Sequence, residues 1–176
     1  MRKFLALALA IVMVFSMTIM ASAENTTVLT TTVPDAKYTL NIPADQKIDF
    51  GAPETEIGGV TVTDSSGFAE GKNLKLTLTF NPFSSNETST TIPYVIKPGL
   101  ATSIGGNIPL FTSGKVITFR GQADGSATER PGIPLSNGNY ADIVNLKVVV
   151  ESADWGKALG GSYSSTITFT TEVVVE

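Results

Sequence analysis

The sequence predicts an all-β protein: an antiparallel β-sandwich, immunoglobulin-like or jelly-roll-like, that follows a cleaved N-terminal signal peptide. Three observations predict this fold class. Threonine, valine, isoleucine and leucine recur in short alternating runs, which is the pattern of half-buried strands. Glycine, proline and Asp-Gly or Asn-Gly pairs separate these runs, as turns separate antiparallel strands. No window combines a sustained helical period with a cap, so no long helix is expected.

An N-terminal targeting segment precedes the domain. Two basic residues open it, and the following stretch 4–20 is almost wholly apolar. Ala21 and Ala23 then supply the small side chains of a cleavage site, so the mature chain is expected to begin at Glu24. The alternative is an uncleaved anchor, because about 17 apolar residues reach the lower limit for a membrane span. The cleavage site and the polar residues after it favour removal of the segment.

Residues 1–23 are therefore expected to be the signal peptide and residues 24–176 a single β-sandwich domain. A mature chain of about 150 residues buries enough surface to form one core without disulfides, which suits a sequence that has no cysteine. We expect the protein to be secreted, extracellular or associated with the cell surface, with no membrane contact after cleavage.

Two runs give the clearest strand predictions. At 73–80 leucine and phenylalanine alternate with lysine and threonine, and at 163–175 a similar alternation runs through a threonine-rich stretch. A period of two places alternate side chains on opposite faces of a sheet, so each strand has one face to bury. Weaker runs predict further strands at 27–33, 37–42, 47–50, 60–63, 91–96, 115–120 and 143–150.

Two stretches are expected to lie outside the strands. The stretch 152–159 has room for one short turn of helix. The stretch 121–136 has no strand signal and is rich in glycine, proline and charged residues, so we expect an exposed functional or disordered loop there.

The composition excludes several classes of function. The chain has no histidine and no cysteine, which removes Ser/His/Asp triads, cysteine nucleophiles, iron–sulfur clusters and the common zinc ligands. With 12 Lys and Arg against 16 Asp and Glu, the net charge is −4, so nucleic-acid binding is not expected. We expect no cofactor, no bound metal and no catalytic residue.

Two stretches carry a resemblance to known proteins. One is YTLNIPA at 38–44 followed by IDFG at 48–51, and the other is WGKALGGSY at 155–163, which leads into the final strand. In layout they resemble secreted Gram-positive surface proteins with an immunoglobulin-like sandwich, of the pilin-like or WxL-like kind. The resemblance implies a non-catalytic surface module whose partner is a cell-wall or glycan ligand or another protein.

Trp155 is the only tryptophan and the first candidate for ligand binding. Together with Tyr140, Tyr163 or Phe83 it would form an aromatic platform on which sugar rings stack. The alternative is a tryptophan that seals one end of the core, and this interpretation is favoured because large aromatic residues are usually well buried.

Acidic residues suggest two further hypotheses. Two carboxyl groups about 5–10 Å apart across a cleft would hydrolyse glycosides, and the closely spaced oxygens at 124–129 would bind calcium. Solvated surface charge is favoured over both, because none of these residues lies in an apolar stretch of sequence. The carboxylates considered are Glu54, Glu56, Asp64, Glu70, Asp124, Glu129, Asp142 and Asp154.

We therefore predict a secreted, non-catalytic surface or structural module, adhesin-like or pilin-like, that binds through loops or sheet edges. The segment 27–33 would pair with the open sheet edge of a partner by strand addition. The alternative function is a stand-alone carbohydrate-binding module that uses Trp155. A carboxylate-based hydrolase ranks last, since the chain offers few groups for acid–base chemistry. The sequence leaves the oligomeric state and the identity of the ligand open.

Overall fold

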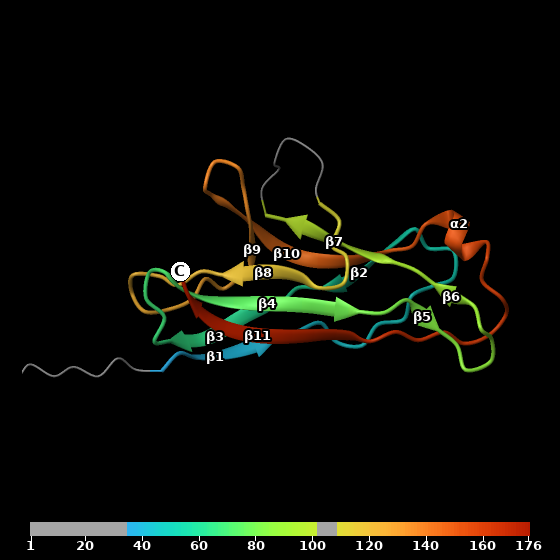
Figure 1. The fold of residues 1–176 in the computed structure, drawn as a ribbon, viewed down its shortest axis with the longest axis horizontal. Helices are drawn as coiled ribbons and strands as arrows, with labels where there is room; N and C mark the ends of the chain where they lie inside the picture. The colour runs from blue at the N-terminus through green and yellow to red at the C-terminus, as the bar shows by residue number, and fades with distance from the viewer. Residues whose placement is uncertain (1–34, 102–108) are drawn as a thin grey trace, which may run out of the picture. The chain divides into compact units, whose positions relative to one another are not determined.

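Antiparallel pairing connects the strands in the part of the chain that the structure describes, residues 35–101 and 109–176 of this computed structural model. These residues belong to one compact unit, Pro34–Glu176. The all-β fold with antiparallel sheets is therefore confirmed (Figure 1). The expected signal peptide, its cleavage site and the predicted strand at 27–33 lie outside the described residues.

Short strands and one turn of helix follow one another along the described residues. They are β1 (Lys37–Asn41), β2 (Glu54–Gly58), β3 (Thr61–Ser66), β4 (Lys72–Phe80), β5 (Phe83–Ser84), β6 (Thr91–Ile92), β7 (Val95–Leu100), β8 (Lys115–Phe119), β9 (Gly132–Pro134), β10 (Tyr140–Val149), α2 (Ser152–Trp155) and β11 (Ile167–Val175). One seven-stranded sheet has the order β11–β4–β8–β9–β10–β2, with β7 as a further partner of β10. β1 pairs with β3, and β5 pairs with β6.

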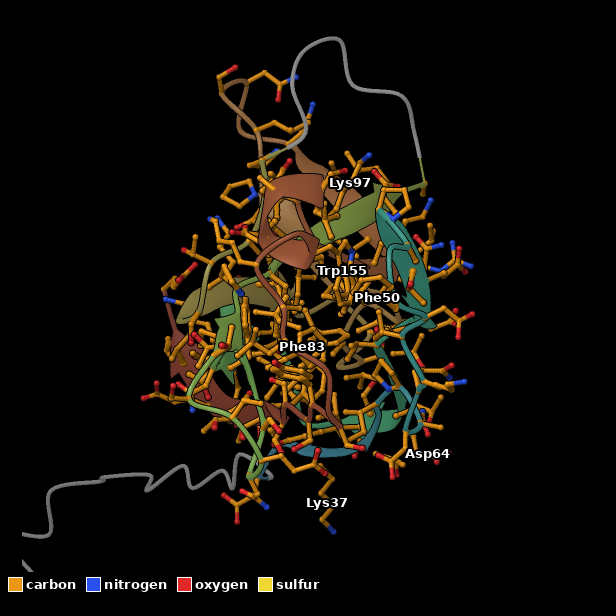
Figure 2. All side chains as sticks on the ribbon, turned by 90° about the vertical axis from the view of Figure 1, so that its right-hand side faces the viewer. Lys37, Phe50, Asp64, Phe83, Lys97 and Trp155 are labelled. Atoms are coloured by element: carbon orange, nitrogen blue, oxygen red, sulfur yellow. The ribbon has the colours of Figure 1, made fainter. Side chains whose placement is uncertain are left out.

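β10 is the strand that curls the large sheet. Its first residues pair with β9, and its second half pairs with β7 on one side and with β2 on the other. A register shift interrupts both of the latter pairings. Because bulges bend a strand and increase its twist, the sheet curls into a half-barrel around its own side chains. Figure 2 shows side chains filling the interior of this half-barrel.

The core comes from alternate positions of the central strands. Leu74, Leu76 and Leu78 of β4 are fully buried, and Ile117 and Phe119 of β8 lie beside them. Lysine and threonine occupy the positions between the leucines, as the period of two predicts. The chain thus builds a core without disulfides, in agreement with the expectation for its length.

The structure confirms several of the predicted strands. The runs at 37–42, 73–80 and 115–120 form β1, β4 and β8, and their ends differ from the prediction by at most one residue. The runs at 60–63 and 143–150 correspond to β3 and β10, which are both longer than the patterns indicated.

Two predicted elements are shorter than expected. The run at 163–175 becomes a strand only from Ile167 onward, and Ser164 before it makes a single bridge with Ser84. The helical turn expected at 152–159 is confined to α2, which ends at Trp155 and has Gly156 as its C-cap. In both cases the missing residues belong to the loop between α2 and β11.

The strand predicted at 47–50 is wrong. This stretch is irregular, and it ends in a turn in which Ala52 N–H donates to Asp49 O at 3.1 Å. Gly51 has a φ of +79°, which glycine adopts at little cost. The strand that follows is β2, which the sequence analysis missed because its glutamates give it a polar pattern.

Two other predictions need correction, because Pro93 was given too little weight and the glycines and prolines of 121–136 were given too much. The run at 91–96 is divided at Pro93 into β6 and β7. The stretch 121–136 is not an exposed or disordered loop, since it contains β9 with the buried Ile133. Pro134 ends that strand, where a missing N–H breaks little of the hydrogen-bond ladder.

Candidate ligand-binding site

Two loops face each other at the end of the half-barrel where β5, β6 and α2 lie (Figure 1). One is the segment 42–50, which follows β1, and the other is the segment 156–165, which follows α2. A cleft of about 980 Å³ lies between them. Its walls combine aromatic and aliphatic side chains with carboxylates, amides and hydroxyls, a mixture that is typical of ligand sites.

Trp155 lies at the inner wall of this cleft. It is half-buried, packs against the core and donates its indole Nε1–H to the carbonyl of Ala52 at 3.0 Å. That hydrogen bond joins α2 to the segment that precedes β2. Trp155 therefore closes this end of the core with one part of its ring and lines the cleft with another.

Phe50 is the aromatic residue that the cleft presents to solvent. It is 76% exposed, and its ring meets the ring of Trp155 edge to face with centroids 5.3 Å apart (Figure 2). The turn at Asp49 and Gly51 holds the ring at the mouth of the cleft. The sequence analysis missed Phe50 as a site residue because it assigned this stretch to a strand. The Asp-Phe-Gly run before Pro53 is the turn signal that would have identified it.

Phe83 and Tyr94 connect the floor of the cleft to the core. Their ring centroids are 4.8 Å apart, and Tyr94 stacks in turn on Phe80 at the same distance. The Ser165 hydroxyl donates to the Asn81 carbonyl at 2.7 Å and lies 2.9 Å from the Tyr94 hydroxyl. Burial raises the pKa of Tyr94, and the hydrogen bond to Ser165 opposes this shift. This floor therefore combines stacked aromatic rings with hydroxyl groups that are hydrogen-bonded within the protein.

Tyr163 organises the outer wall. Its hydroxyl accepts the N–H of Leu159 at 3.2 Å and lies 3.1 Å from the Leu159 carbonyl. It also lies 3.1 Å from the Thr88 hydroxyl in the loop between β5 and β6. The hydroxyl is thus occupied within the protein, and the residue shapes the cleft from behind.

The structure brings three of the four predicted aromatic residues together. Trp155, Tyr163 and Phe83 all line the cleft. Tyr140 does not, because it starts β10, where the guanidinium of Arg120 lies 4.6 Å from its ring centroid. A platform that contains Tyr140 is therefore ruled out in this conformation.

Several acidic residues that the sequence analysis considered serve in ion pairs. Glu54 lies 2.6 Å from Lys97 and 3.8 Å from Lys147, and Asp142 lies 2.9 Å from Arg120. The hydrogen bond from Lys97 is the main cause of the lowered pKa of Glu54. A general acid needs the opposite shift, so Glu54 is suited to linking β2 to β7 across β10 rather than to proton donation.

The stretch 124–129 closes on itself. Asp124 accepts hydrogen bonds from the Ser126 hydroxyl at 2.6 Å and from the Ser126 N–H at 2.9 Å, and these bonds lower its pKa. The Thr128 hydroxyl accepts the N–H of Arg120 at 2.8 Å. Among the described residues no cluster of three or more acidic side chains is placed to hold a metal ion.

The carboxylates that do lie at the cleft are Asp45 and Asp49. Both are exposed, and Asp49 lies 3.6 Å from the equally exposed Lys47. They form a polar rim around Phe50.

In the part of the chain that is described, no helix is long and apolar enough to cross a membrane.

Comparison of the chain with protein-family models, curated proteins and solved structures finds no match. Function must therefore be inferred from the chemistry of the cleft and of the sheet edges.

Proposed function

We propose that this protein is a secreted, non-catalytic surface module that holds its ligand in the cleft between the segments 42–50 and 156–165. The observation that carries the proposal is the exposure of Phe50 at the mouth of the cleft, next to the anchored Trp155. Phe50 and Leu159 both line the cleft and are 76% and 57% exposed, and exposed apolar side chains that are grouped at a cleft support a binding role.

A carbohydrate is the ligand class that the lining favours. The apolar face of a sugar ring stacks on an aromatic side chain, and its hydroxyls need hydrogen-bond partners around that contact. Phe50 supplies the ring, and Asp45, Gln46 and Asp49 supply acceptors and donors around the same cleft. This supports the carbohydrate-binding alternative that Trp155 first suggested, with Phe50 as the stacking residue.

Binding without catalysis is supported by the setting of the polar groups. The chain has neither histidine nor cysteine. A catalytic carboxylic acid depends on desolvation, whereas Asp45 and Asp49 are exposed. The cleft therefore offers recognition through fixed aromatic rings and solvated polar groups.

The finer fold class and the location are part of the same proposal. We assign the half-barrel to the immunoglobulin-like or jelly-roll-like sandwiches, with residues 1–23 as a signal peptide. Support for two facing layers comes from β1, whose Tyr38 packs on Phe68 with ring centroids 6.2 Å apart and reaches Thr171 of β11. The residues at the cleavage site support secretion.

Retention on insoluble polysaccharides tests the proposed function. The chain beginning at Glu24 should be retained on at least one polysaccharide of a panel, and Phe50→Ala should reduce retention about tenfold without changing the melting temperature. Tyr140→Ala is the matched control, because it removes an aromatic ring outside the cleft. Equal retention of the Phe50→Ala variant and the parent would overturn the assignment of the cleft.

A further inference from the structure

β11 forms one border of an open seam in the half-barrel. Among the described residues its backbone pairs with β4 alone. β1 runs beside it in the opposite direction (Figure 1), and the two strands meet through side chains, with the Tyr38 hydroxyl 2.8 Å from Thr171 Oγ1. No described strand lies between them, so the outer edge of β11 has no backbone partner among the described residues.

A groove lies along this seam, and its lining combines apolar side chains with the polar Asp45, Gln46, Ser165 and Thr166. It has a volume of about 220 Å³. One wall is the segment after β1, with Ile42 and Ile48, and the other is the start of β11, with Ile167 and Phe169. Both β11 residues are only half-buried, although their partners in β4, Phe80 and Leu78, are buried. The groove therefore leaves inward-facing apolar side chains partly uncovered.

The free backbone groups of β11 face this seam. Gly114 N–H donates to Leu78 O, so the backbone of Leu78 is turned toward β8. Phe169 lies opposite Leu78 and is therefore turned away from β4. The same alternation turns the N–H and C=O groups of Ile167 and Thr171 outward. An added strand would thus find hydrogen-bond partners along the groove.

The edges of β2 and β7 are protected, and that of β11 is not. β2 carries Glu54 and Glu56, β7 carries Lys97 and Pro98, and each pairs with β10 through a register shift. Charges, prolines and bulges are the devices that prevent edge-to-edge association. β11 keeps an unbroken register with β4 over its nine residues and carries one charge, Glu172. Its edge is thus suited to pairing.

We infer that this seam binds the segment 27–33 of a second copy of the chain, and this does not depend on ligand binding in the cleft. The segment reads TVLTTTV, has no charge and contains only β-branched residues and leucine. Its length suits the nine residues of β11. As a strand it would place Leu29 and Val33 on one face, toward the groove, and Thr30 on the other.

The path of Asp35 and Ala36 indicates that the segment bound in the seam comes from a second copy rather than from the same chain. They continue the line of β1 and pack against Gly67, just beyond the pair formed by Lys37 and Ser66. The chain also enters β1 at the end remote from the groove, which Ile42 and the residues after it line.

Association of this kind joins unlike surfaces. The donor surface is the N-terminal segment of one copy, and the acceptor surface is the seam of the next. Such heterologous contacts leave one donor and one acceptor free at the ends of every open assembly. The expected products are therefore open chains of increasing length rather than closed dimers.

Sedimentation velocity over a series of concentrations, without glycan, tests the inference. The chain beginning at Glu24 should form a concentration-dependent ladder of species. Leu29→Lys should weaken association at least about tenfold, because it would place a charge in the groove, whereas the matched variant Thr30→Lys should associate like the parent. A monomer at all concentrations would overturn the inference, and so would equal association of the two variants.

A second pair of variants tests the acceptor edge. Thr171→Pro removes a backbone N–H that faces the seam, so this variant should no longer form the series of oligomers. Val175→Pro removes a backbone N–H that lies beyond the reach of the segment 27–33, so this variant should still form the oligomers. Melting temperatures verify that each variant is folded. If Leu29→Lys instead lowers the melting temperature of a monomer, the segment fills the seam of its own chain and the inference fails. Persistence of the ladder in both Leu29→Lys and Thr171→Pro would also contradict it.

Discussion

Phe50 and Trp155 meet edge to face, with ring centroids 5.3 Å apart, although one stands on a turn before β2 and the other ends α2. The two rings differ in what holds them. Trp155 is half-buried and hydrogen-bonded through its indole N–H, whereas Phe50 is 76% exposed. The pair therefore divides into an anchor and a contact residue, and each should respond differently to substitution.

Trp155→Ala should destabilise the fold. It removes the packing of the ring against the core and the 3.0 Å hydrogen bond to the Ala52 carbonyl. Full truncation of a buried tryptophan costs about 3–5 kcal/mol, so a half-buried one should cost about 2 kcal/mol. Trp155→Phe keeps most of the packing and should cost about 1 kcal/mol, the usual value of one hydrogen bond. Urea unfolding measures both, and an unchanged midpoint for Trp155→Ala would show that the ring is not structural.

The fold class and the clearest strands were predictable because burial follows a short-range pattern in those strands. β4 alternates leucine with lysine and threonine, and each leucine is buried. β2 was not predictable in this way, because its buried Ile57 follows the exposed Glu56 and is stabilised by long-range pairing with β10. β9 was hidden by Gly132 and Pro134, which are common in loops.

The candidate site was predictable only in part. Trp155 stands out as a single tryptophan, but its partner Phe50 comes from a distant loop, and the packing of the two loops sets their contact. Local sequence patterns hold no information on that packing. Tyr140 was grouped with Trp155 on residue type alone, and the register of β10 places it beside Arg120 instead.

Gly121→Ala should destabilise the protein through a backbone clash. A Cβ at Gly121 would overlap the carbonyl oxygens of Ala69 and Lys72, which are backbone atoms and cannot move aside easily. Such overpacking costs about 1–3 kcal/mol. Gly160→Ala is the control, because a Cβ there meets no atom within 4 Å. Thermal unfolding compares the two variants, and equal melting temperatures would contradict the close approach at Gly121.

Tyr94 should make stability fall at alkaline pH. Burial raises its pKa in the folded state above the ordinary value of about 10. At pH values below about 10, the Tyr94 phenol is protonated in both the folded and the unfolded chain, so its full contribution to the free energy of unfolding is present. As the pH rises, the unfolded chain ionises first, so the free energy of unfolding falls until the pH passes the folded pKa. Tyr94→Phe should remove this part of the loss, and Tyr140→Phe should not. A parallel decline in the parent and Tyr94→Phe would contradict the prediction.

Tyr163→Phe should loosen the outer wall of the cleft without unfolding the protein. The variant keeps the ring but loses the hydroxyl contacts with the Leu159 backbone and with Thr88. Because the Leu159 groups lie in an exposed loop, water replaces the lost partner, and the stability cost should be about 1 kcal/mol or less. Ligand affinity should fall more noticeably, since a wall that must be ordered on binding imposes an entropic cost. Hydrogen exchange of the Leu159 amide and retention on polysaccharide measure the two effects, with Tyr140→Phe as the control. Faster exchange with unchanged retention would show that this wall does not contact the ligand.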